Sequence, residues 1–353
     1  MIYNAELAHV VSFLPEKKII NKDLIATMAE EEKKHNQKKG YLGEDLQSNP
    51  FFKGVAERRF ASPEYSSVDL GERVVKKLLT ETGLHANDID LILCSCVFTD
   101  TFWPGIASAI QAKINAKRCS IINIDTSCAS FLTGVNIAKA FIESGKYKNV
   151  VMITVTNFIS RLTEFQKSPR SFVLGDGATA ALIKRGKANI IASYEHSFGE
   201  HYGLMRFEPD FCDKKFYNYW ERNSGPITVN FDREMIDRIR DNAMDIVPRA
   251  LNECFKQAHL KAKDIQMLIT HQPNTFFLEK WRDKIGIQPP RAYDTLAKYG
   301  NLFQGSLPVT LADAIEKRLV KTGDLIALAT FSNGGDFASA MIMKYISPFE
   351  DPV

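Results

Sequence analysis

The chain repeats part of its own sequence, and such a repeat favours folds built from two similar units. Segments of related sequence occur in the same order in both halves, and the first two pairs lie 176 positions apart. The pairs are Leu84–Ile92 with Leu260–Leu268, Asn149–Thr154 with Leu325–Thr330, and Gly177–Lys184 with Phe337–Lys344. Several matched blocks in one order predict two copies of a single supersecondary arrangement.

The expected strands are short and apolar along their whole length rather than alternating, which is typical of sheets covered on both faces. Amphipathic stretches at Val74–Thr82 and Ala250–Ala258 precede a strand in each copy. We therefore predict an α/β protein whose two similar halves, residues 1–185 and 186–353, pack against each other. A chain of 353 residues is long enough to build both.

Bulk composition excludes several classes of protein. The formal net charge is only +3, which does not favour a partner such as nucleic acid or a membrane surface. No run of 18 apolar residues predicts a membrane span, and the first residues lack the layout of a signal peptide. The six cysteines show no metal-ligand spacing, so we expect no metal and a reduced, cytoplasmic protein.

A candidate nucleophile lies where the strand Ile121–Asp125, expected to be buried, turns into a helix at Phe131–Ile142. Cys128 stands in this turn between small neighbours. A helix N-terminus directs N–H groups and the positive end of the helix dipole at a nearby thiol, which lowers its pKa. Cys128 is therefore a candidate for carrying an acyl group. The alternative is an inert buried cysteine.

The repeat predicts which distant residues meet Cys128. The second-half counterpart of the Ser127–Cys128 turn falls at about Asn301–Leu302, judged by the helices that follow each turn. The counterpart of the strand end at Ser95 is His271. Equivalent strand ends lie close together when two related halves pack around a pseudo-twofold axis, so Cys128, His271 and Asn301 are expected to converge.

Four segments carry a family resemblance. They are Asp125–Ser130, Thr270–Asn274, Tyr299–Ser306 and Phe331–Ala340, supported by Gly54–Arg59 and Gly175–Ala178. Together they resemble the ketoacyl-acyl-carrier-protein synthase III branch of the thiolase superfamily, over nearly the whole chain. The resemblance implies a thiolase-like fold with layers in the order αβαβα, a homodimer, and catalytic roles for Cys128, His271 and Asn301.

The resemblance also implies a reaction. The Cys128 thiolate attacks an acyl thioester, and the N–H groups of Cys128 and Gly334 form the oxyanion hole. The extender is a malonyl- or β-ketoacyl-type thioester. A malonyl-type extender loses carbon dioxide, and His271 and Asn301 stabilise the enolate that attacks acyl-Cys128. The substrates are thioesters of CoA or of phosphopantetheine on an acyl carrier protein, and no bound cofactor is expected. The pathway is fatty acid initiation or a polyketide-like specialised route.

Some positions depart from the family pattern and bear on substrate choice. Phe276 replaces an arginine that helps the carrier protein to dock, and Phe51–Lys53 replaces residues that grip the CoA nucleotide. Arg161, Arg240 and Lys53 are the cations we would test for phosphate contact. Trp103 matches a segment that closes the partner's acyl pocket across the dimer. The remaining candidate substrate contact is Asn274, which is expected to order its loop or to bridge a water.

Two stretches look inserted, and two other functions stay open. Residues 29–39 form a charge run expected to be a solvated face or loop, and residues 207–220 are rich in aromatics that cover a tunnel, an interface or the core. The first alternative function keeps the acyl-enzyme but transfers the acyl group to an alcohol or amine. The second is a silent structural subunit of a heterodimeric synthase.

Overall fold

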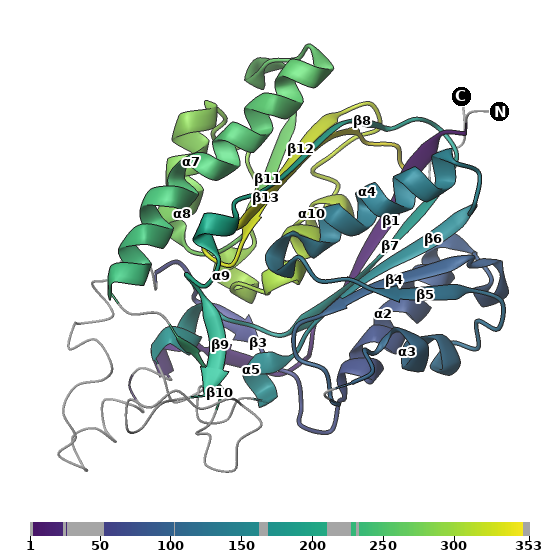
Figure 1. Ribbon diagram of the computed structural model, residues 1–353, viewed down its shortest axis with the longest axis horizontal. Helices are drawn as coiled ribbons and strands as arrows, with labels where there is room; N and C mark the ends of the chain where they lie inside the picture. Colours follow the sequence, from purple (N-terminus) through teal and green to yellow (C-terminus); the bar gives the residue numbers. More distant parts are fainter. Residues whose placement is uncertain are drawn as a thin grey trace.

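The computed structural model describes residues 3–23, 26, 53–101, 103–161, 169–209, 227–230 and 233–348. Two mixed β-sheets dominate this part of the chain (Figure 1). The first sheet has the order β1-β7-β6-β4-β5, and its strands are β1 (Ala5–Phe13), β4 (Leu91–Cys96), β5 (Ser120–Asn123), β6 (Asn149–Thr156) and β7 (Gly177–Arg185). The second has the order β11-β12-β13-β8, and its strands are β8 (Ile190–Ser197), β11 (Met267–Thr270), β12 (Leu325–Ser332) and β13 (Phe337–Lys344).

The two sheets share one pairing pattern. In the first sheet β4 runs parallel to β6, and β6, β7 and β1 follow as antiparallel neighbours. In the second sheet β11 runs parallel to β12, and β12, β13 and β8 follow in the same way. All strands of the first sheet lie between residues 5 and 185, and those of the second between 190 and 344. The exact division at residues 185 and 186 remains our interpretation.

Helices separate and cover the sheets. The helices α4 (Ser130–Glu143) and α10 (Ser306–Glu316) contact strands of both sheets and form the middle layer (Figure 1). The first sheet is covered on its other face by α2 (Ser67–Thr82) and α3 (Ala107–Lys113). The second is covered by α7 (Arg233–Ala258) and α8 (Thr275–Ile285). This arrangement confirms the predicted αβαβα layering.

The core follows these layers. One apolar cluster fills the middle layer between the sheets and includes Phe131 and Leu132 from α4 and Leu307 and Leu311 from α10. Clusters on the two outer faces pack under α2 and α3 and under α7 and α8. Since α4 and α10 are buried between two sheets, their N-terminal ends have fixed positions. The turn that contains Cys128 leads into α4, and the turn that follows Asn301 leads into α10.

Helix caps are encoded locally. At the start of α2 the Ser66 hydroxyl accepts from the Asp69 N–H while the Asp69 carboxylate accepts from the Ser66 N–H, so two of the orphan N–H groups of the helix are satisfied. The same helix ends at Gly83, whose φ of 66° is left-handed and favours glycine. These signals explain why α2 begins and ends where it does.

The repeat survives in three dimensions with its 176-residue offset. The strands β4 and β6 correspond to β11 and β12, and α4 corresponds to α10. Short 3₁₀ turns correspond as well: η2 (Ala86–Asp88) to η6 (Ala262–Asp264), and η3 (Ser127–Ala129) to η7 (Phe303–Gly305). The other short elements are β2 (Lys18–Ile20), β3 (Glu57–Arg59), α5 (Phe158–Arg161), η4 (Pro169–Val173), η5 (Gly199–His201), β9 (Arg206–Pro209), β10 (Ile227–Asn230) and α9 (Leu296–Tyr299).

One prediction about the strands is wrong. The strand before the nucleophile turn was expected to be buried, but β5 is the edge of its sheet, and the Ser120, Ile122 and Asn123 side chains are exposed. An edge strand has a neighbour on only one side, so apolar residues there do not require burial. The charge run at 29–39, the residues 51 and 52, and most of the aromatic stretch at 207–220 lie outside the described residues.

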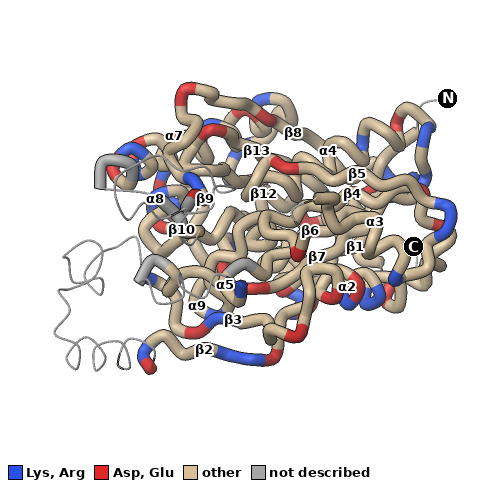
Figure 2. Tube along the Cα trace, turned by 60° about the horizontal axis from the view of Figure 1, so that its bottom comes forward, with Lys and Arg blue, Asp and Glu red and all other residues tan. Residues whose placement is uncertain are grey.

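The described surface carries mixed charge. Lys and Arg alternate with Asp and Glu along α2 and over much of the remaining trace, rather than gathering as one sign (Figure 2). Within the described ranges, no helix combines the length and the apolar character needed to span a membrane.

Candidate active site

The Cys128 turn is held by hydrogen bonds from its own neighbours. The Ser127 N–H donates to Asp125 Oδ1 at 2.8 Å, and the Thr126 N–H donates to Ser130 Oγ at 3.0 Å. Ser127 has a φ of +49°, a left-handed conformation that turns the chain sharply before α4. These contacts place Cys128, which is 5% exposed, in the 3₁₀ turn that leads into the helix.

The second half contains the same turn. The Phe303 N–H donates to Asn301 Oδ1 at 2.8 Å, the Leu302 N–H donates to Ser306 Oγ at 2.7 Å, and Phe303 also has a φ of +49°. Asn301 therefore occupies the position of Asp125. The counterpart of Cys128 is Gln304, two residues later than predicted, because the true offset between the turns is 176 residues and the helices were matched two residues out of register.

The nucleophile turn and His271 are attached to consecutive residues of β12. Thr330 Oγ1 donates to the Cys128 carbonyl at 3.3 Å, and the His271 N–H donates to the Ala329 carbonyl at 2.9 Å. The η3 turn also contacts the η7 turn that follows Asn301. Segments carrying Cys128, His271 and Asn301 are thus brought to one end of the sheets, although the three residues are far apart in sequence.

His271 follows β11 and is 2% exposed. Its ring meets the ring of Phe331 edge-on, with centroids 5.7 Å apart. Burial lowers the pKa of His271 to about 3, so the imidazole is neutral at physiological pH. Nδ1 has no hydrogen-bond partner among the described residues. A neutral imidazole carries one N–H donor, and that donor is available for a developing negative charge.

The Cys128 thiol is protonated in the substrate-free protein. Burial raises its pKa to about 12; the Ser127 hydroxyl, 3.9 Å from Sγ, lowers it, and the carboxylates of Asp336 and Asp125 raise it further. The predicted lowering of this pKa by the helix N-terminus is therefore wrong for the substrate-free protein. Desolvation is the largest cause of the raised pKa, because an apolar surrounding disfavours the charged thiolate.

Asn301 has its side-chain oxygen and its backbone fixed. Oδ1 accepts from the Phe303 N–H and from Ser306 Oγ at 3.1 Å, so the amide nitrogen is the side-chain atom left to donate to a ligand. The Asn301 N–H donates to the Val173 carbonyl at 2.6 Å, and its carbonyl accepts from the Gly175 N–H at 3.0 Å. The position of this side chain therefore depends on residues 173–175.

The surroundings of Cys128 are apolar. It belongs to a cluster of buried side chains, against which partly buried aromatics also pack. The buried members are Phe60, Cys128, Ile159, Val173, Leu174 and Phe303. An apolar lining beside a thiol is compatible with an acyl chain rather than with a charged substrate group.

The turn that contains Gly334 joins β12 to β13. Gly334 has a φ of +83° and Gly335 a φ of +120°, and the Gly335 N–H donates to the Ser332 carbonyl at 2.7 Å. A Cβ at Gly334 would come within 2.6 Å of the Ile239 side chain on α7. Glycine is required here by both conformation and space. Since η3 contacts β13 and β12, this turn lies near the nucleophile.

The other predicted contacts are dispersed. Arg161 is engaged internally, because it donates to the Pro63 and Tyr65 carbonyls and pairs with Asp100 at 3.6 Å. Arg240 lies on α7 and pairs with Asp237 at 2.7 Å and Asp241 at 3.2 Å. Asn274 Oδ1 accepts from the Phe277 N–H at 3.0 Å and caps α8, in agreement with a loop-ordering role. Phe276 packs on the core beneath α8, whereas Trp103 is 81% exposed.

Sequence reasoning missed two buried ionic residues next to the site. Arg58 on β3 is 2% exposed, and Asp176 is fully buried. Both occur in segments that contribute to the resemblance, Gly54–Arg59 and Gly175–Ala178. An arginine and an aspartate beside apolar neighbours were the available signal, and no local spacing encodes the electrostatic influence of Asp176 on Arg58, 118 positions away.

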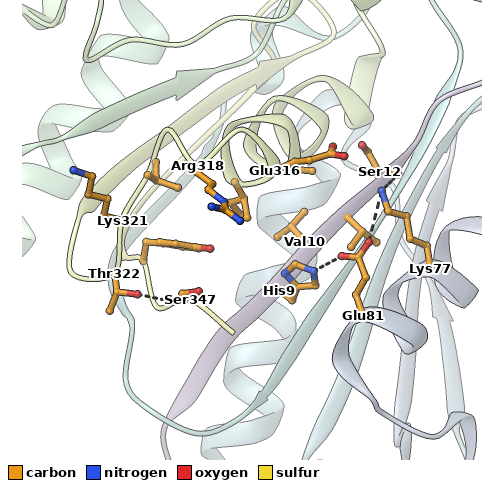
Figure 3. Close-up of a pocket in the computed structure, with 15 residues that line it drawn as sticks. His9, Val10, Ser12, Lys77, Glu81, Glu316, Arg318, Lys321, Thr322 and Ser347 are labelled. Atoms are coloured by element: carbon orange, nitrogen blue, oxygen red, sulfur yellow. Dashed lines mark hydrogen bonds and ion pairs between the residues drawn. The ribbon is translucent and has the colours of Figure 1, made fainter. Parts of the chain in front are cut away.

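A separate groove of about 650 Å³ lies away from these residues. His9, Val10 and Ser12 of β1 line it together with Lys77 and Glu81 of α2, and the His9 Nε2 and Glu81 Oε2 atoms are 2.7 Å apart (Figure 3). The opposite wall is formed by Arg318, Lys321, Thr322 and Ser347 (Figure 3). None of Cys128, His271 and Asn301 lines it, so this groove is not the candidate active site.

Comparisons with known proteins agree with this geometry. Two models of one family match the chain: "3-Oxoacyl-[acyl-carrier-protein (ACP)] synthase III" over residues 122–199 and its C-terminal model over residues 255–344. The first match contains Cys128, and the second contains His271 and Asn301. The β-ketoacyl-[acyl-carrier-protein] synthase III of Caldanaerobacter subterraneus subsp. tengcongensis is 29% identical over 291 residues, covering 82% of this chain and 86% of that protein. The Oceanobacillus iheyensis enzyme of the same name is 29% identical over 281 residues, covering 80% and 84%.

Solved structures support the fold. The 3-oxoacyl-[acyl-carrier-protein] synthase III of Aquifex aeolicus superposes with a TM-score of 0.79 at 24% identity, over 97% of this chain and 100% of that one. The priming β-ketosynthase of the R1128 polyketide pathway gives a TM-score of 0.81 at 19% identity, over 98% of each chain. The thiolase-like layers, the Cys128 turn and both family matches therefore agree, and the chain is similar in both halves to the 3-oxoacyl-[acyl-carrier-protein] synthase III proteins.

Proposed function

We propose that this protein forms an acyl thioester on Cys128 and condenses it with a malonyl- or β-ketoacyl-type thioester. The observation that carries the proposal is the attachment of Cys128 and His271 to consecutive residues of β12, with Asn301 on the matching turn of the other half. A thiol, a neutral imidazole and a carboxamide donor at one buried place suit this chemistry and suit few others.

In the first step the Cys128 sulfur attacks the carbonyl of an acyl thioester. The thioester C–S bond breaks, the acyl group stays on Cys128, and the thiol proton leaves with the departing CoA or phosphopantetheine thiol. The N–H groups of Cys128 and Gly334 are the proposed oxyanion-hole donors. Because the thiol starts protonated, the step requires that binding of the thioester promotes loss of this proton.

In the second step a malonyl-type extender thioester binds and loses carbon dioxide. The electron pair of the broken C–C bond forms an enolate, whose oxygen accepts hydrogen bonds from His271 Nε2 and Asn301 Nδ2. Removing one such donor elsewhere costs about 10²–10³ in rate. The enolate carbon attacks the acyl-Cys128 carbonyl, the C–S bond to Cys128 breaks, and the thiolate takes up a proton from water. The products are a β-ketoacyl thioester and the free Cys128 thiol. The low pKa of His271 keeps the ring neutral for this role.

Several features bear on substrates. The apolar cluster around Cys128 favours an aliphatic or aromatic acyl group. Phe276 stands where family members use an arginine for carrier-protein docking, and it packs on the core. We therefore propose that thioesters of CoA and of an acyl carrier protein both be tested as donor and as extender. The relatives are named as β-ketoacyl-[acyl-carrier-protein] synthases, which supports an acyl carrier protein as one partner.

We further propose that the protein acts as a homodimer through the β5 edge. Ile122 on this strand is 37% exposed, and Trp103 is 81% exposed in one protomer. An open strand edge with exposed apolar side chains is suited to pairing with a second copy. Ile122→Lys is expected to shift the molar mass measured by light scattering from dimer to monomer, and a monomeric wild-type protein would contradict the proposal.

Mass spectrometry tests the function. Incubation with short- and medium-chain acyl-CoA should add one acyl mass to the intact protein and to the Cys128 peptide. Cys128→Ala should abolish the adduct, whereas Cys254→Ala, at a buried free cysteine on α7, should retain it. Carbon dioxide release from malonyl thioesters then separates condensation from simple acyl transfer. No adduct on the wild-type protein with any acyl donor would refute the proposal.

A further inference from the structure

The Asn301 backbone forms a short bridge with the segment 171–176. The Asn301 N–H donates to the Val173 carbonyl at 2.6 Å, and the Gly175 N–H donates to the Asn301 carbonyl at 3.0 Å. The two segments form an isolated parallel bridge between Leu174 and Asn301. Any displacement of residues 173–175 is therefore passed directly to the residue that we propose stabilises the enolate.

Two glycines make this contact unusually close. A Cβ placed on Gly175 would approach the Tyr299 carbonyl oxygen to under 3.0 Å, and a Cβ on Gly300 would lie 2.8 Å from the Val173 carbonyl oxygen. Real Cβ atoms are not found at such distances from backbone atoms. The backbones of residues 173–175 and 299–301 are thus in direct contact. Because no side chain lies between them, a shift of one segment cannot be absorbed by a change of rotamer.

Arg58 holds the segment from its other side. The buried guanidinium donates through Nη1 to the Ser171 carbonyl at 2.9 Å and to the Leu174 carbonyl at 3.0 Å. Its Nε donates to Asn21 Oδ1 at 3.2 Å, and Asn21 Nδ2 donates in turn to the Phe172 carbonyl at 2.7 Å. Arg58 and Asn21 together therefore bind the carbonyls of three residues in the segment that carries the Asn301 bridge.

Asp176 completes the arrangement at the end of the segment. Its carboxylate accepts from the Ala61 N–H at 2.9 Å and the Ile159 N–H at 3.2 Å, and its own N–H donates to the Arg59 carbonyl at 2.9 Å. Burial lowers the pKa of the Arg58 guanidinium to about 10, and the Asp176 carboxylate partly offsets this shift by electrostatic attraction. Burial raises the pKa of Asp176 itself to about 7, so this attraction weakens as Asp176 takes up a proton below that pH. A buried cation that lacks such compensation would be strongly destabilising.

We propose that Arg58 is a positioning residue for Asn301, acting through residues 171–175, and that it is needed mainly for the decarboxylation and condensation steps. This inference rests on the proposed function. Cys128 depends less on the segment, because its carbonyl is held by Thr330 on β12 and its contacts with Val173 and Leu174 are apolar. Misplacing Asn301 therefore slows enolate formation while acylation of Cys128 continues.

The test compares the two half-reactions in Arg58→Lys. Lysine keeps the charge but lacks the planar fork that binds two carbonyls and Asn21 together. Acylation of Cys128 by acyl-CoA should stay within about threefold of wild type, while kcat for decarboxylation of a malonyl thioester falls by about tenfold or more at similar KM, since displacement of about 1 Å can cost 10² in rate. An equal loss in both half-reactions would overturn the proposal, as would no loss in either.

Arg291→Lys is the matched control. Arg291 Nη1 also binds two carbonyls, those of Ala262 and Ile265 at 3.1 and 3.0 Å, but these lie in the η6 region. It should leave the ratio of the two half-reactions unchanged. If Arg58→Lys does not fold, Asn21→Ala is measured instead and should lower the same ratio; if neither variant folds, Arg58 is structural only and the proposal fails. Absence of acylation in the wild-type protein would instead refute the proposed function.

Discussion

The reactivity of Cys128 toward an alkylating reagent should rise steeply with pH. Only the thiolate reacts, and its fraction depends on the distance between the pH and the pKa. With a pKa of about 12, roughly 10⁻⁴ of Cys128 is thiolate at pH 8, against about 10⁻¹ for a thiol at its model value of 9.0. The alkylation rate should therefore be about a thousandfold below that of a small reference thiol and should increase about tenfold per pH unit from pH 6 to 9.

The assay is timed alkylation with iodoacetamide, followed by mass spectrometry of the Cys128 peptide, with glutathione alkylated in parallel as the reference. The slope against pH is the decisive quantity, because restricted access slows the reaction by the same factor at every pH. His271 is neutral throughout this range, so His271→Ala should leave the slope unchanged. A rate that is already constant below pH 8 in the wild type, and becomes pH-dependent in His271→Ala, would show a thiolate–imidazolium pair and refute the reasoning.

Three further outcomes are expected. Asn301→Ala should reduce decarboxylation of a malonyl thioester by about 10²–10³ while Cys128 acylation in the same preparation persists, because one enolate donor is lost. Gly175→Ala should destabilise the protein by about 1–3 kcal/mol through contact with the Tyr299 carbonyl, whereas Gly199→Ala, whose Cβ meets nothing within 4 Å, should change stability by no more than about 0.5 kcal/mol, as measured by urea unfolding. Trp281→Ala, at a fully buried ring, should cost about 3–5 kcal/mol and lower the melting temperature; a shift of under 1 °C would contradict its role in the core beneath α8.

The layered fold was accessible from the sequence because the repeat and the apolar strands are local signals. The offset of 176 residues places Ser95 opposite His271, and the structure keeps this offset from β4 and β11 to α4 and α10. The two α/β halves therefore followed from the repeat, whereas the thiolase-like order of the layers was implied by the family resemblance. The second turn was misplaced because the two helices that served as the guide were matched two residues out of the true register.

The electrostatics of the site were not accessible in the same way. A helix N-terminus can be inferred from sequence, but the burial that raises the pKa of Cys128 comes from residues such as Phe60 and Leu174, which reach it only in the folded chain. The Arg58 arrangement is similar, since its carbonyl partners lie more than 100 positions away. The pKa of a catalytic side chain, and the hydrogen bonds that position it, can therefore be predicted only when its neighbours in the folded chain are known.

The duplicated turn has a consequence for how one ancestral unit can acquire two chemical tasks. In both halves an oxygen two residues before the left-handed residue accepts its N–H at 2.8 Å, from Asp125 in one copy and Asn301 in the other. A carboxylate and a carboxamide satisfy that bond equally, yet only the carboxamide offers a donor to a ligand. A change from carboxylate to carboxamide therefore leaves the turn intact. The first copy of the turn carries the Cys128 thiol, and the second offers the Asn301 amide N–H as a donor to an enolate.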